Sequence, residues 1–439
     1  MKKVAMRSVA ALMLAALLTL GMVYFVYLYI TRGETWATYH ANSHIVSALA
    51  GSSITILDRN GVTLLAGEGQ ERTYNPDVSI RKSTLHVVGD LEGNIYSPAM
   101  RVYSTVVSGY DTVGGIKKGA EEMRLSLDSG ACSAALAAMG DRSGTVGVYN
   151  YQTGEVLCLI STPTYDPLSP PDLSAGDSGY EGIYVNRFFN STYTPGSVFK
   201  LVTSAAAIDS MDDIFTRQFT CEGSMTLSGQ KIVCSNTHGT LDFKTALAKS
   251  CNCAFGQIAA QLGEEDLQRY VDKVEICDSL TFQGIGTARG QFDLSQANTG
   301  DLAWAGIGQY STLVNPCAMM VLMGAVANGG RQMLPSLVAG ENGRLADQVM
   351  PYTTASLLKE MMANDVAATY GQSNFPGLRI CAKSGTAENG TDTPHAWFTG
   401  FLEDSDHPYA FVVVAESSGS GSEVAGGIAN QVLQYMVKQ

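Results

Sequence analysis

The N-terminal segment of this chain is the feature that most constrains its fold. After Lys2, Lys3 and Arg7 the chain carries no charged residue until Arg32. The 24 residues from 8 to 31 are rich in Leu, Ala, Val, Met and Tyr. An apolar helix of about 20 residues crosses a hydrocarbon core of about 30 Å. The sequence therefore predicts one membrane-spanning helix, with the bulk of the chain on one side of the membrane.

The charges that flank this segment predict its orientation. The whole chain has a formal net charge of −13, but its first 32 residues hold four cations and no acid, so the remainder carries −17. Because Lys and Arg favour the cytoplasmic flank, we expect a cytoplasmic N-terminus and an extracytoplasmic bulk. A domain this acidic is not expected to bind nucleic acid. A cleaved signal peptide is the alternative, although the run is longer than is usual for one.

Apolar runs and turns divide the chain into three parts. We predict a cytoplasmic tip and membrane anchor at 1–32, a small α+β module at 33–120, and a large domain at 121–439. Short strand-like runs in the module lie at 54–57, 62–65 and 86–88, and the turn at 58–61 is a hairpin signal.

In the large domain, apolar and polar residues follow a strand-like pattern near both ends and a helix-like pattern in the middle. Strands are expected at 145–150, 155–161, 378–386, 396–402 and 409–417, with helices at 130–139 and 427–437. This order predicts an α+β fold with one five-stranded antiparallel sheet flanked by helices. A second uncharged run, 302–330, does not predict another span, because its apolar stretch at 317–327 is too short. A buried core helix is expected there.

Ser197 and Lys200 form the first chemical signal. They follow a Pro-Gly pair and precede the apolar run 201–208, so Ser197 is expected to open a helix. Residues three apart share a helix face. A serine there can act as a nucleophile if a desolvated, neutral lysine takes its proton. A capping serine beside a solvated lysine is the far commoner origin of such a pair.

Two further signals lie downstream. Ser250 and Asn252 fall between two helical runs, where a loop can present a hydroxyl and an amide to a cleft. Lys383 and Ser384 end a predicted strand, followed by a glycine and a hydroxyl at Gly385 and Thr386. Gly385 would permit close approach of an extended substrate backbone. Each signal alone also has an ordinary structural explanation: the first could be a simple turn, and the second an edge strand with a charge and a glycine bend.

Together, the three signals match a known signature. S-x-x-K, S-x-N and K-S-G-T occur in this order, in the contexts of helix start, interhelical loop and strand end. These are the motifs of β-lactamases and penicillin-binding proteins. The chain resembles a class B penicillin-binding protein of the penicilloyl-serine transferase superfamily. The resemblance extends to D-R-N-G at 58–61, to T-G-E at 153–155 with S-T-P-T-Y-D-P at 161–167, and to I-G-Q at 307–309, although Tyr310 stands where the family usually has glycine.

The resemblance implies a D,D-transpeptidase that cross-links peptidoglycan stem peptides. Carried over by motif, Ser197 is the nucleophile on the D-Ala-D-Ala donor and Lys200 the leading general base. Ser250 relays a proton to the leaving amine, and Lys383 tunes that step. The remaining roles are substrate binding: Asn252 for an amide of the substrate, and Ser384, Gly385 and Thr386 for its backbone and terminal carboxylate. Backbone N–H groups of Ser197 and Thr386 would form the oxyanion hole.

The resemblance also implies partners and alternatives. β-Lactams would mimic the donor and trap Ser197, and a polytopic glycan polymerase in the membrane is the expected protein partner. A D,D-carboxypeptidase or β-lactamase-like hydrolase, in which water resolves the acyl-enzyme, is the first alternative. A non-catalytic β-lactam sensor or scaffold is the second. No cofactor is expected.

The nine cysteines give no recognisable metal pattern. No CxxC pair with a second CxxC or HxxxH occurs, so spacing does not support a zinc site and no metal is predicted. Cys221 and Cys234 bracket a glycine-containing turn and are the best candidates for a disulfide, with free thiols as the alternative. His238 is interpreted as a structural loop residue rather than a metal ligand.

Overall fold

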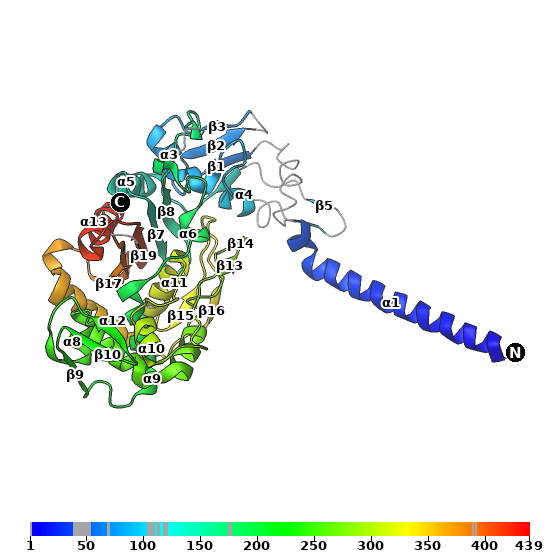
Figure 1. Ribbon diagram of the computed structural model, residues 1–439. Helices are drawn as coiled ribbons and strands as arrows, with labels where there is room; N and C mark the ends of the chain where they lie inside the picture. Colours follow the sequence, from blue (N-terminus) through cyan, green and yellow to red (C-terminus); the bar gives the residue numbers. More distant parts are fainter. Residues whose placement is uncertain are drawn as a thin grey trace.

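The computed structural model describes residues 2–37, 54–67, 71–102, 110–111, 115–116, 122–173, 178–388, 390 and 393–439. Helix α1 (Lys2–Ala37) projects away from the rest of the chain (Figure 1). Its segment Lys2–Arg32 is the one helix among these residues that is long and apolar enough to cross a membrane, and its side chains are exposed. The predicted apolar helix is confirmed, and it fits a membrane anchor.

The N-terminal module is built on a four-stranded sheet in the order β3-β2-β1-β6. Its strands are β1 (Ile54–Leu57), β2 (Thr63–Gly67), β3 (Thr73–Tyr74) and β6 (Glu122–Arg124), with helices α3 (Val78–Val88) and α4 (Pro98–Val102) and the short pair β4 (Tyr110–Asp111) and β5 (Gly115–Ile116). The strand predicted at 86–88 is wrong, because these residues form the last turn of α3. A short apolar run does not distinguish a strand from a buried helix end.

Several polar contacts join this module to the large domain, among them one at Asp58 and one at Arg81. The Asp58 carboxylate, in the turn after β1, accepts hydrogen bonds from the Ser129 hydroxyl (2.6 Å) and the Ser129 N–H (3.2 Å) at the start of α5. Arg81 in α3 donates from Nε and Nη2 to the two oxygens of Asp166, at 2.8 and 2.5 Å. Strand β6 pairs in parallel with β1, so the module's sheet extends to 122–124, just past the predicted boundary at 120. The three-part division stays a prediction.

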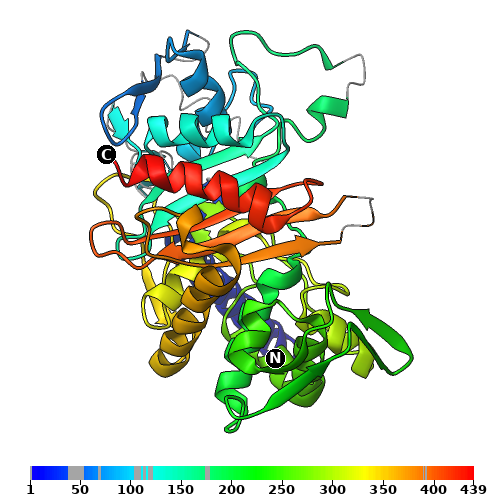
Figure 2. The same ribbon diagram turned by 90° about the vertical axis from the view of Figure 1, so that its left-hand side faces the viewer.

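The large domain is organised around one antiparallel sheet in the order β17-β18-β19-β7-β8. Its strands are β7 (Gly144–Asn150), β8 (Val156–Thr162), β17 (Ile380–Ala387), β18 (His395–Leu402) and β19 (Tyr409–Ala415). Helices α5 (Ser129–Met139) and α13 (Gly426–Met436) lie side by side over one face (Figure 2), while α11 (Pro316–Ala327) contacts β18, β19 and β7. The predicted five-stranded sheet with flanking helices is confirmed.

The second uncharged run forms the buried interior of this domain. Every residue of α11 from Pro316 to Val326 is buried. A helix that is apolar all round has no solvent face, and α11 lies between the sheet and the helical region. The expected core helix is therefore confirmed.

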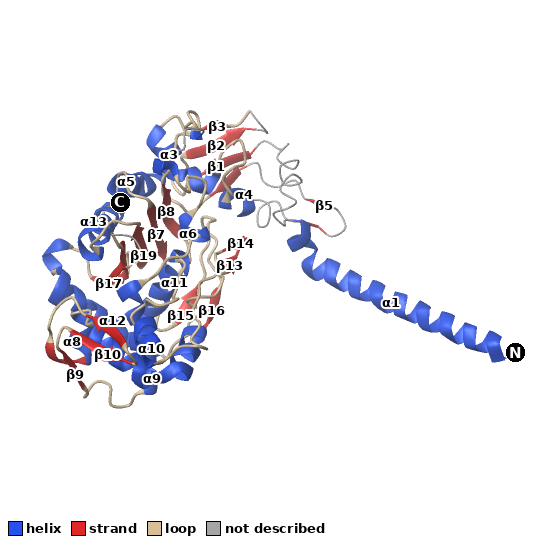
Figure 3. Ribbon diagram, viewed as in Figure 1, coloured by secondary structure: helices blue, strands red, loops and turns tan. Residues whose placement is uncertain are grey.

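The helical region also contains small strand pairs that the sequence did not predict (Figure 3). Its helices are α6 (Arg187–Asn190), α7 (Lys200–Ser210), α8 (Phe243–Ala248), α9 (Asn252–Lys273), α10 (Thr299–Gly306) and α12 (Tyr352–Asp365). Its strands are β9 (Gln218–Cys221), β10 (Ser224–Leu227), β11 (Gln230–Val233), β12 (Gly239–Asp242), β13 (Thr281–Phe282), β14 (Ile285–Gly286), β15 (Arg331–Met333) and β16 (Leu345–Gln348).

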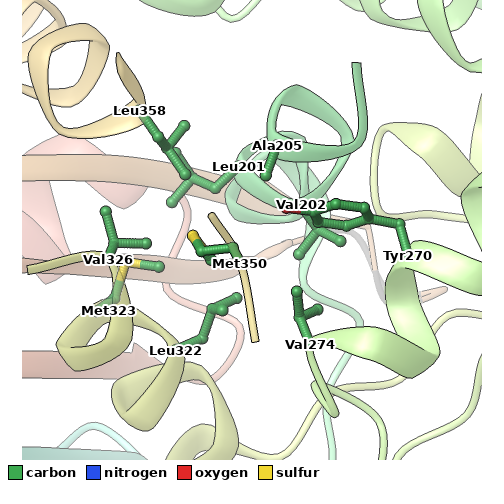
Figure 4. Close-up of a pocket in the computed structure, with 10 residues that line it drawn as sticks. All are labelled: Leu201, Val202, Ala205, Tyr270, Val274, Leu322, Met323, Val326, Met350 and Leu358. Carbon is green, nitrogen blue, oxygen red and sulfur yellow. The ribbon is translucent and has the colours of Figure 1, made fainter. Parts of the chain in front are cut away.

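Apolar packing fixes α7 within this region. Leu201, Val202 and Ala205 on its buried side face side chains of α9, α11 and α12 and the segments beside them (Figure 4). The lining is aliphatic apart from the Tyr270 ring. Such a surface offers almost nothing to orient a polar ligand, so its role is to hold α7 and the residues at its start in place.

Candidate active site

Ser197 lies in a short 3₁₀ turn (η5, Gly196–Phe199), and α7 begins only at Lys200. Ser197 was expected to open the α-helix itself, but the α-helix begins after this 3₁₀ turn, at Lys200. In 3₁₀ geometry residues i and i+3 eclipse one another, which brings the two side chains together. Gly196 has a φ of +55°, and a Cβ there would lie 3.0 Å from the Cα of Ala387 in β17. Glycine therefore lets the turn that carries Ser197 pack directly on the edge strand.

Lys200 is fully buried, and its Nζ contacts four oxygen atoms. It lies 3.1 Å from Ser197 Oγ, 3.1 Å from Ser250 Oγ, 2.7 Å from the Ser250 carbonyl and 2.7 Å from Asn252 Oδ1. Burial, followed by the charge of Lys383, lowers the pKa of Lys200 to about 7. A lysine with this pKa is partly neutral at physiological pH and can accept a proton.

Ser250 and Asn252 lie on the turn that joins α8 to α9. Ser250 has a φ of +49°, in the left-handed region that non-glycine residues rarely adopt. Its Oγ receives hydrogen bonds from Lys200 Nζ (3.1 Å) and Lys383 Nζ (3.2 Å). The Asn252 side chain donates to the Val233 carbonyl at 2.8 Å while its oxygen accepts from Lys200. The turn therefore places the Ser250 hydroxyl between the two amines.

The K-S-G-T motif lies on β17, the edge strand of the central sheet. Lys383 is fully buried, Ser384 is half-buried and Thr386 is exposed, so the strand turns its amine inward and its hydroxyls outward. An edge strand leaves backbone groups available to an added extended peptide. A Cβ on Gly385 would lie 2.8 Å from the Pro195 carbonyl. Glycine at this position is therefore required for packing against the turn that carries Ser197, a reason that the sequence did not reveal.

Two residues of the site were missed by the sequence motifs. The Tyr370 hydroxyl accepts a hydrogen bond from the Ser384 N–H (2.8 Å) and lies 3.0 Å from Ser384 Oγ and 3.4 Å from Lys383 Nζ. Asp365, at the end of α12, is buried, and neither carboxylate oxygen has a hydrogen-bond partner among the described residues. Burial raises the pKa of Asp365 to about 7, against the opposing charges of Lys383 and Lys200. Both residues precede Lys383 outside any motif, so no spacing signal identifies them.

Tyr310 departs from the family pattern without disturbing the neighbouring backbone. It adopts a φ of +62° and is exposed, so it takes the left-handed conformation that glycine adopts most easily. Two residues earlier, Gly308 accepts a hydrogen bond from the Gly196 N–H at 2.9 Å. A Cβ on Gly308 would lie 2.1 Å from the Gly196 carbonyl oxygen, a severe clash. Gly308 is thus the glycine that supports the turn carrying Ser197.

The cysteines behave differently from the sequence expectation. All nine are free, so the disulfide considered between Cys221 and Cys234 is wrong. Instead, their sulfur atoms lie with those of Cys251 and the imidazole of His238 in one cluster, whose donor atoms are all within 4.8 Å of one another. The interpretation of His238 as a structural loop residue rather than a metal ligand stays a prediction, although its imidazole lies beside the sulfur atoms of Cys221 and Cys234. Sequence spacing does not reveal this cluster, because the four residues come from separate short elements.

The fold and these motifs define a family. Residues 144–434 match the family described as penicillin-binding protein transpeptidase domain. The chain belongs to this family, and its likeness to the class B penicillin-binding proteins is confirmed.

Among curated relatives, the chain is 31% identical to peptidoglycan D,D-transpeptidase PbpA of Mycobacterium tuberculosis over 326 residues, which cover 66% of this chain and 65% of that protein. It is 28% identical to stage V sporulation protein D of Bacillus subtilis over 302 residues, covering 63% of this chain and 46% of the relative. The chain thus spans just under two thirds of the length of the PbpA relatives that it matches.

Solved structures share the fold. A ceftriaxone acyl-enzyme complex of penicillin-binding protein A from M. tuberculosis superposes with a TM-score of 0.74 at 23% identity, covering 88% of this chain and 99% of the other. The D,D-transpeptidase domain of a peptidoglycan glycosyltransferase from Eggerthella lenta gives a TM-score of 0.72 at 25% identity, with the same coverage.

Proposed function

We propose that this protein is a peptidoglycan D,D-transpeptidase that cross-links stem peptides through an acyl-enzyme on Ser197 and is trapped there by β-lactams. One observation carries the proposal. Lys200 Nζ lies 3.1 Å from both Ser197 Oγ and Ser250 Oγ, and Ser250 Oγ lies 3.2 Å from Lys383 Nζ. This continuous path runs from nucleophile to base to relay hydroxyl to second lysine, as serine acyl transfer requires.

Acylation begins with neutral Lys200, which accepts the Ser197 hydroxyl proton as Oγ bonds to the carbonyl carbon of the penultimate D-Ala. Collapse of the tetrahedral intermediate breaks the C–N bond to the terminal D-Ala. The departing amine takes a proton from the Ser250 hydroxyl, which regains one from Lys200. Lys383 stabilises the charge that passes through this hydroxyl, since its amine already contacts Ser250.

Deacylation reverses the path with a different amine. The amino group of a neighbouring stem peptide attacks the acyl carbon and loses a proton to the Ser250–Lys200 pair, and Ser197 Oγ leaves with that proton. The product is a new peptide cross-link. If water attacked instead, the same residues would give a carboxypeptidase or a β-lactamase-like hydrolase. The transpeptidase differs from these hydrolases in its acceptor, which is an amine rather than water.

Substrate binding is assigned to the outward-facing groups. The donor would lie along β17 as an added strand, its terminal carboxylate at the hydroxyls of Ser384 and Thr386. Gly385 belongs to this binding segment through its backbone. Asn252 would bind an amide of the stem peptide, and the N–H groups of Ser197 and Thr386 would stabilise the oxyanion. Support comes from the partial or full exposure of Ser384, Thr386 and Asn252, in contrast with the two buried lysines.

We further propose that α1 anchors the protein once, with a cytoplasmic N-terminus and the remaining domains outside. The cations at the start of α1 and the acidic remainder support this orientation. A polytopic glycan polymerase in the same membrane is the proposed partner, on the resemblance alone.

Product analysis tests the proposed activity. Full-length protein in detergent is given a D-Ala-D-Ala stem peptide with and without an acceptor amine, and products are identified by mass spectrometry. We expect a cross-linked product that Ser197→Ala abolishes. Release of D-Ala without cross-linking would establish a hydrolase. Acylation by penicillin without turnover of any peptide would establish a sensor.

A further inference from the structure

A group of three thiols and one imidazole lies against the candidate active site but takes no part in its chemistry. We call Cys221, Cys234, His238 and Cys251 the thiol–imidazole cluster. One donor atom from each lies within 4.8 Å of all the others. The three cysteines are buried, and His238 is partly exposed.

We propose that the thiol–imidazole cluster is a structural Zn²⁺ site with three thiolate ligands and one imidazole ligand. In a tetrahedral site, Zn–S bonds of about 2.3 Å and Zn–N bonds of about 2.05 Å imply S···S separations of about 3.8 Å and S···N separations of about 3.6 Å. The observed values are 3.9 Å between the sulfurs of Cys234 and Cys251, and 3.6 and 3.5 Å from His238 Nδ1 to the sulfurs of Cys221 and Cys234. Three of the six donor separations thus match a zinc tetrahedron, and the other three are within 4.8 Å.

The local fold explains how distant residues converge. Cys221 ends β9, Cys234 follows β11, His238 precedes β12 and Cys251 caps α9. Strand β9 pairs with β12, and the Cys234 N–H donates to the Gly223 carbonyl at 2.9 Å. These contacts close the hairpin β10–β11 over the cluster. The spacing in sequence is therefore C-x12-C-x3-H-x12-C, which has no adjacent cysteine pair.

Backbone donors surround the sulfur atoms as they do in metal–thiolate sites. The Asn252 N–H points to Cys234 Sγ at 3.3 Å, and the Ala254 N–H points to Cys251 Sγ at 3.4 Å. Both groups belong to the first turn of α9, where the helix dipole favours negative charge. Such outer contacts orient the ligands and stabilise them as thiolates.

The segment that carries the cluster has little hydrophobic core of its own. Of the sixteen residues in β9 to β12, only Phe219, Cys221, Ile232 and Leu241 are buried. Small units with so few buried side chains commonly depend on disulfides or a metal, and the thiols here are free. Zinc would supply the missing cross-link between the two hairpins and α9.

The site would also position the catalytic turn. Cys251 stands between Ser250, which contacts both lysines, and Asn252, which contacts Lys200. A Zn–S bond at Cys251 would fix the left-handed backbone of the preceding residue, Ser250, from the side opposite the two lysines. Cys251 is thus a positioning residue, and the metal itself contacts no substrate in this proposal.

Metal binding must release protons, which gives it a distinct signature. Three Zn–S bonds form as three S–H bonds break, so three protons leave to solvent for each ion bound. A disulfide would require an oxidant and an S–S distance of about 2.05 Å, far shorter than the 3.9 Å between Cys234 and Cys251.

The test uses the full-length chain, purified in detergent under reducing conditions without chelators. We expect about one zinc per chain by elemental analysis, three additional reactive thiols after chelation, and three protons released when ZnCl₂ is restored. Replacement by Co²⁺ should give thiolate charge-transfer absorption and tetrahedral d–d bands. Wild-type protein that holds no zinc, takes up none from ZnCl₂ and has all nine thiols reduced would overturn the proposal.

Matched variants separate ligands from other cysteines. Cys234→Ser should reduce zinc to well below one per chain, and Cys277→Ser, outside the cluster, should leave it at one. His238→Cys offers a four-cysteine site and should retain the metal, whereas His238→Ala should weaken it. Full zinc content in Cys234→Ser would contradict the proposal. Metal content is measured without any substrate, so this test of the zinc site does not depend on the transpeptidase activity.

Discussion

The turn of Ser250, Cys251 and Asn252 separates two polar clusters with opposite arrangements. On one side, buried amines contact hydroxyls that stay partly open to solvent. On the other side, the sulfur atoms are buried, and two backbone N–H groups donate to the sulfurs of Cys234 and Cys251. The first arrangement suits proton transfer to a substrate, whereas the second suits retention of an ion.

This difference shows how one turn can serve chemistry and architecture together. Neighbouring side chains of an extended or turn segment point in different directions, so Cys251 faces the thiol–imidazole cluster while Ser250 and Asn252 face Lys200. Reaction rates are sensitive to displacements of about 1 Å at such groups. Removal of the Lys200 amine should therefore slow acylation far more than a change on the sulfur side does.

The largest effect is expected for Lys200→Ala. Without Lys200, no amine lies next to the Ser197 hydroxyl, and general-base catalysis is worth about 10²- to 10⁴-fold. We expect the rate of acylation by fluorescent penicillin to fall by about that factor while the circular dichroism spectrum is unchanged. The exposed neighbour Lys249, changed to alanine, should have the wild-type rate. Wild-type labelling of Lys200→Ala would remove Lys200 from the mechanism.

A somewhat smaller effect is expected from pH. Burial lowers the pKa of Lys200 to about 7, and below that pH the amine is protonated and cannot accept the Ser197 proton. The acylation rate constant should therefore rise about 50-fold from pH 5 to pH 7 and about 100-fold from pH 5 to a plateau above pH 8. Rapid-quench measurements between pH 5 and 9 check this profile. A rate that is flat or falls with pH would show that neutral Lys200 is not the base.

On the sulfur side, Cys251→Ser should slow acylation by about tenfold, because Ser250 and Asn252 lose their support while keeping their own functional groups. Rates and zinc content are measured on the same preparation, with Cys277→Ser as the matched control. A normal rate in zinc-free Cys251→Ser would separate the two clusters and restrict the metal to stability.

The smallest effect is expected for Tyr370→Phe. The Tyr370 hydroxyl accepts from the Ser384 N–H and contacts Lys383, and loss of one such buried partner costs about 1–1.4 kcal/mol. Acylation should slow by about five- to tenfold. The acylation rate is measured by labelling kinetics, and a thermal melt of the same preparation distinguishes a slower reaction from loss of folding. An unchanged rate would mean that Tyr370 merely fills space beside the strand.

Short motifs with fixed local geometry could be predicted from the sequence. The S-x-x-K, S-x-N and K-S-G-T segments each fold within one turn or strand, so their spacing in sequence fixes their local geometry. The five-stranded sheet could be predicted from runs of alternating apolar and polar residues. Tyr370, Asp365 and the thiol–imidazole cluster could not be predicted, because they meet the site only through long-range packing. The apolar run at 86–88 failed for another reason, since burial of a helix end imitates a strand.

The central claim is that Ser197 is the nucleophile of a serine acyltransferase. Full-length protein is incubated with penicillin G, its intact mass is measured, and proteolytic peptides are sequenced by mass spectrometry. The account predicts one penicilloyl adduct per chain, located on Ser197 and absent from Ser197→Ala. An unmodified wild-type protein, or an adduct on any other residue, would contradict it.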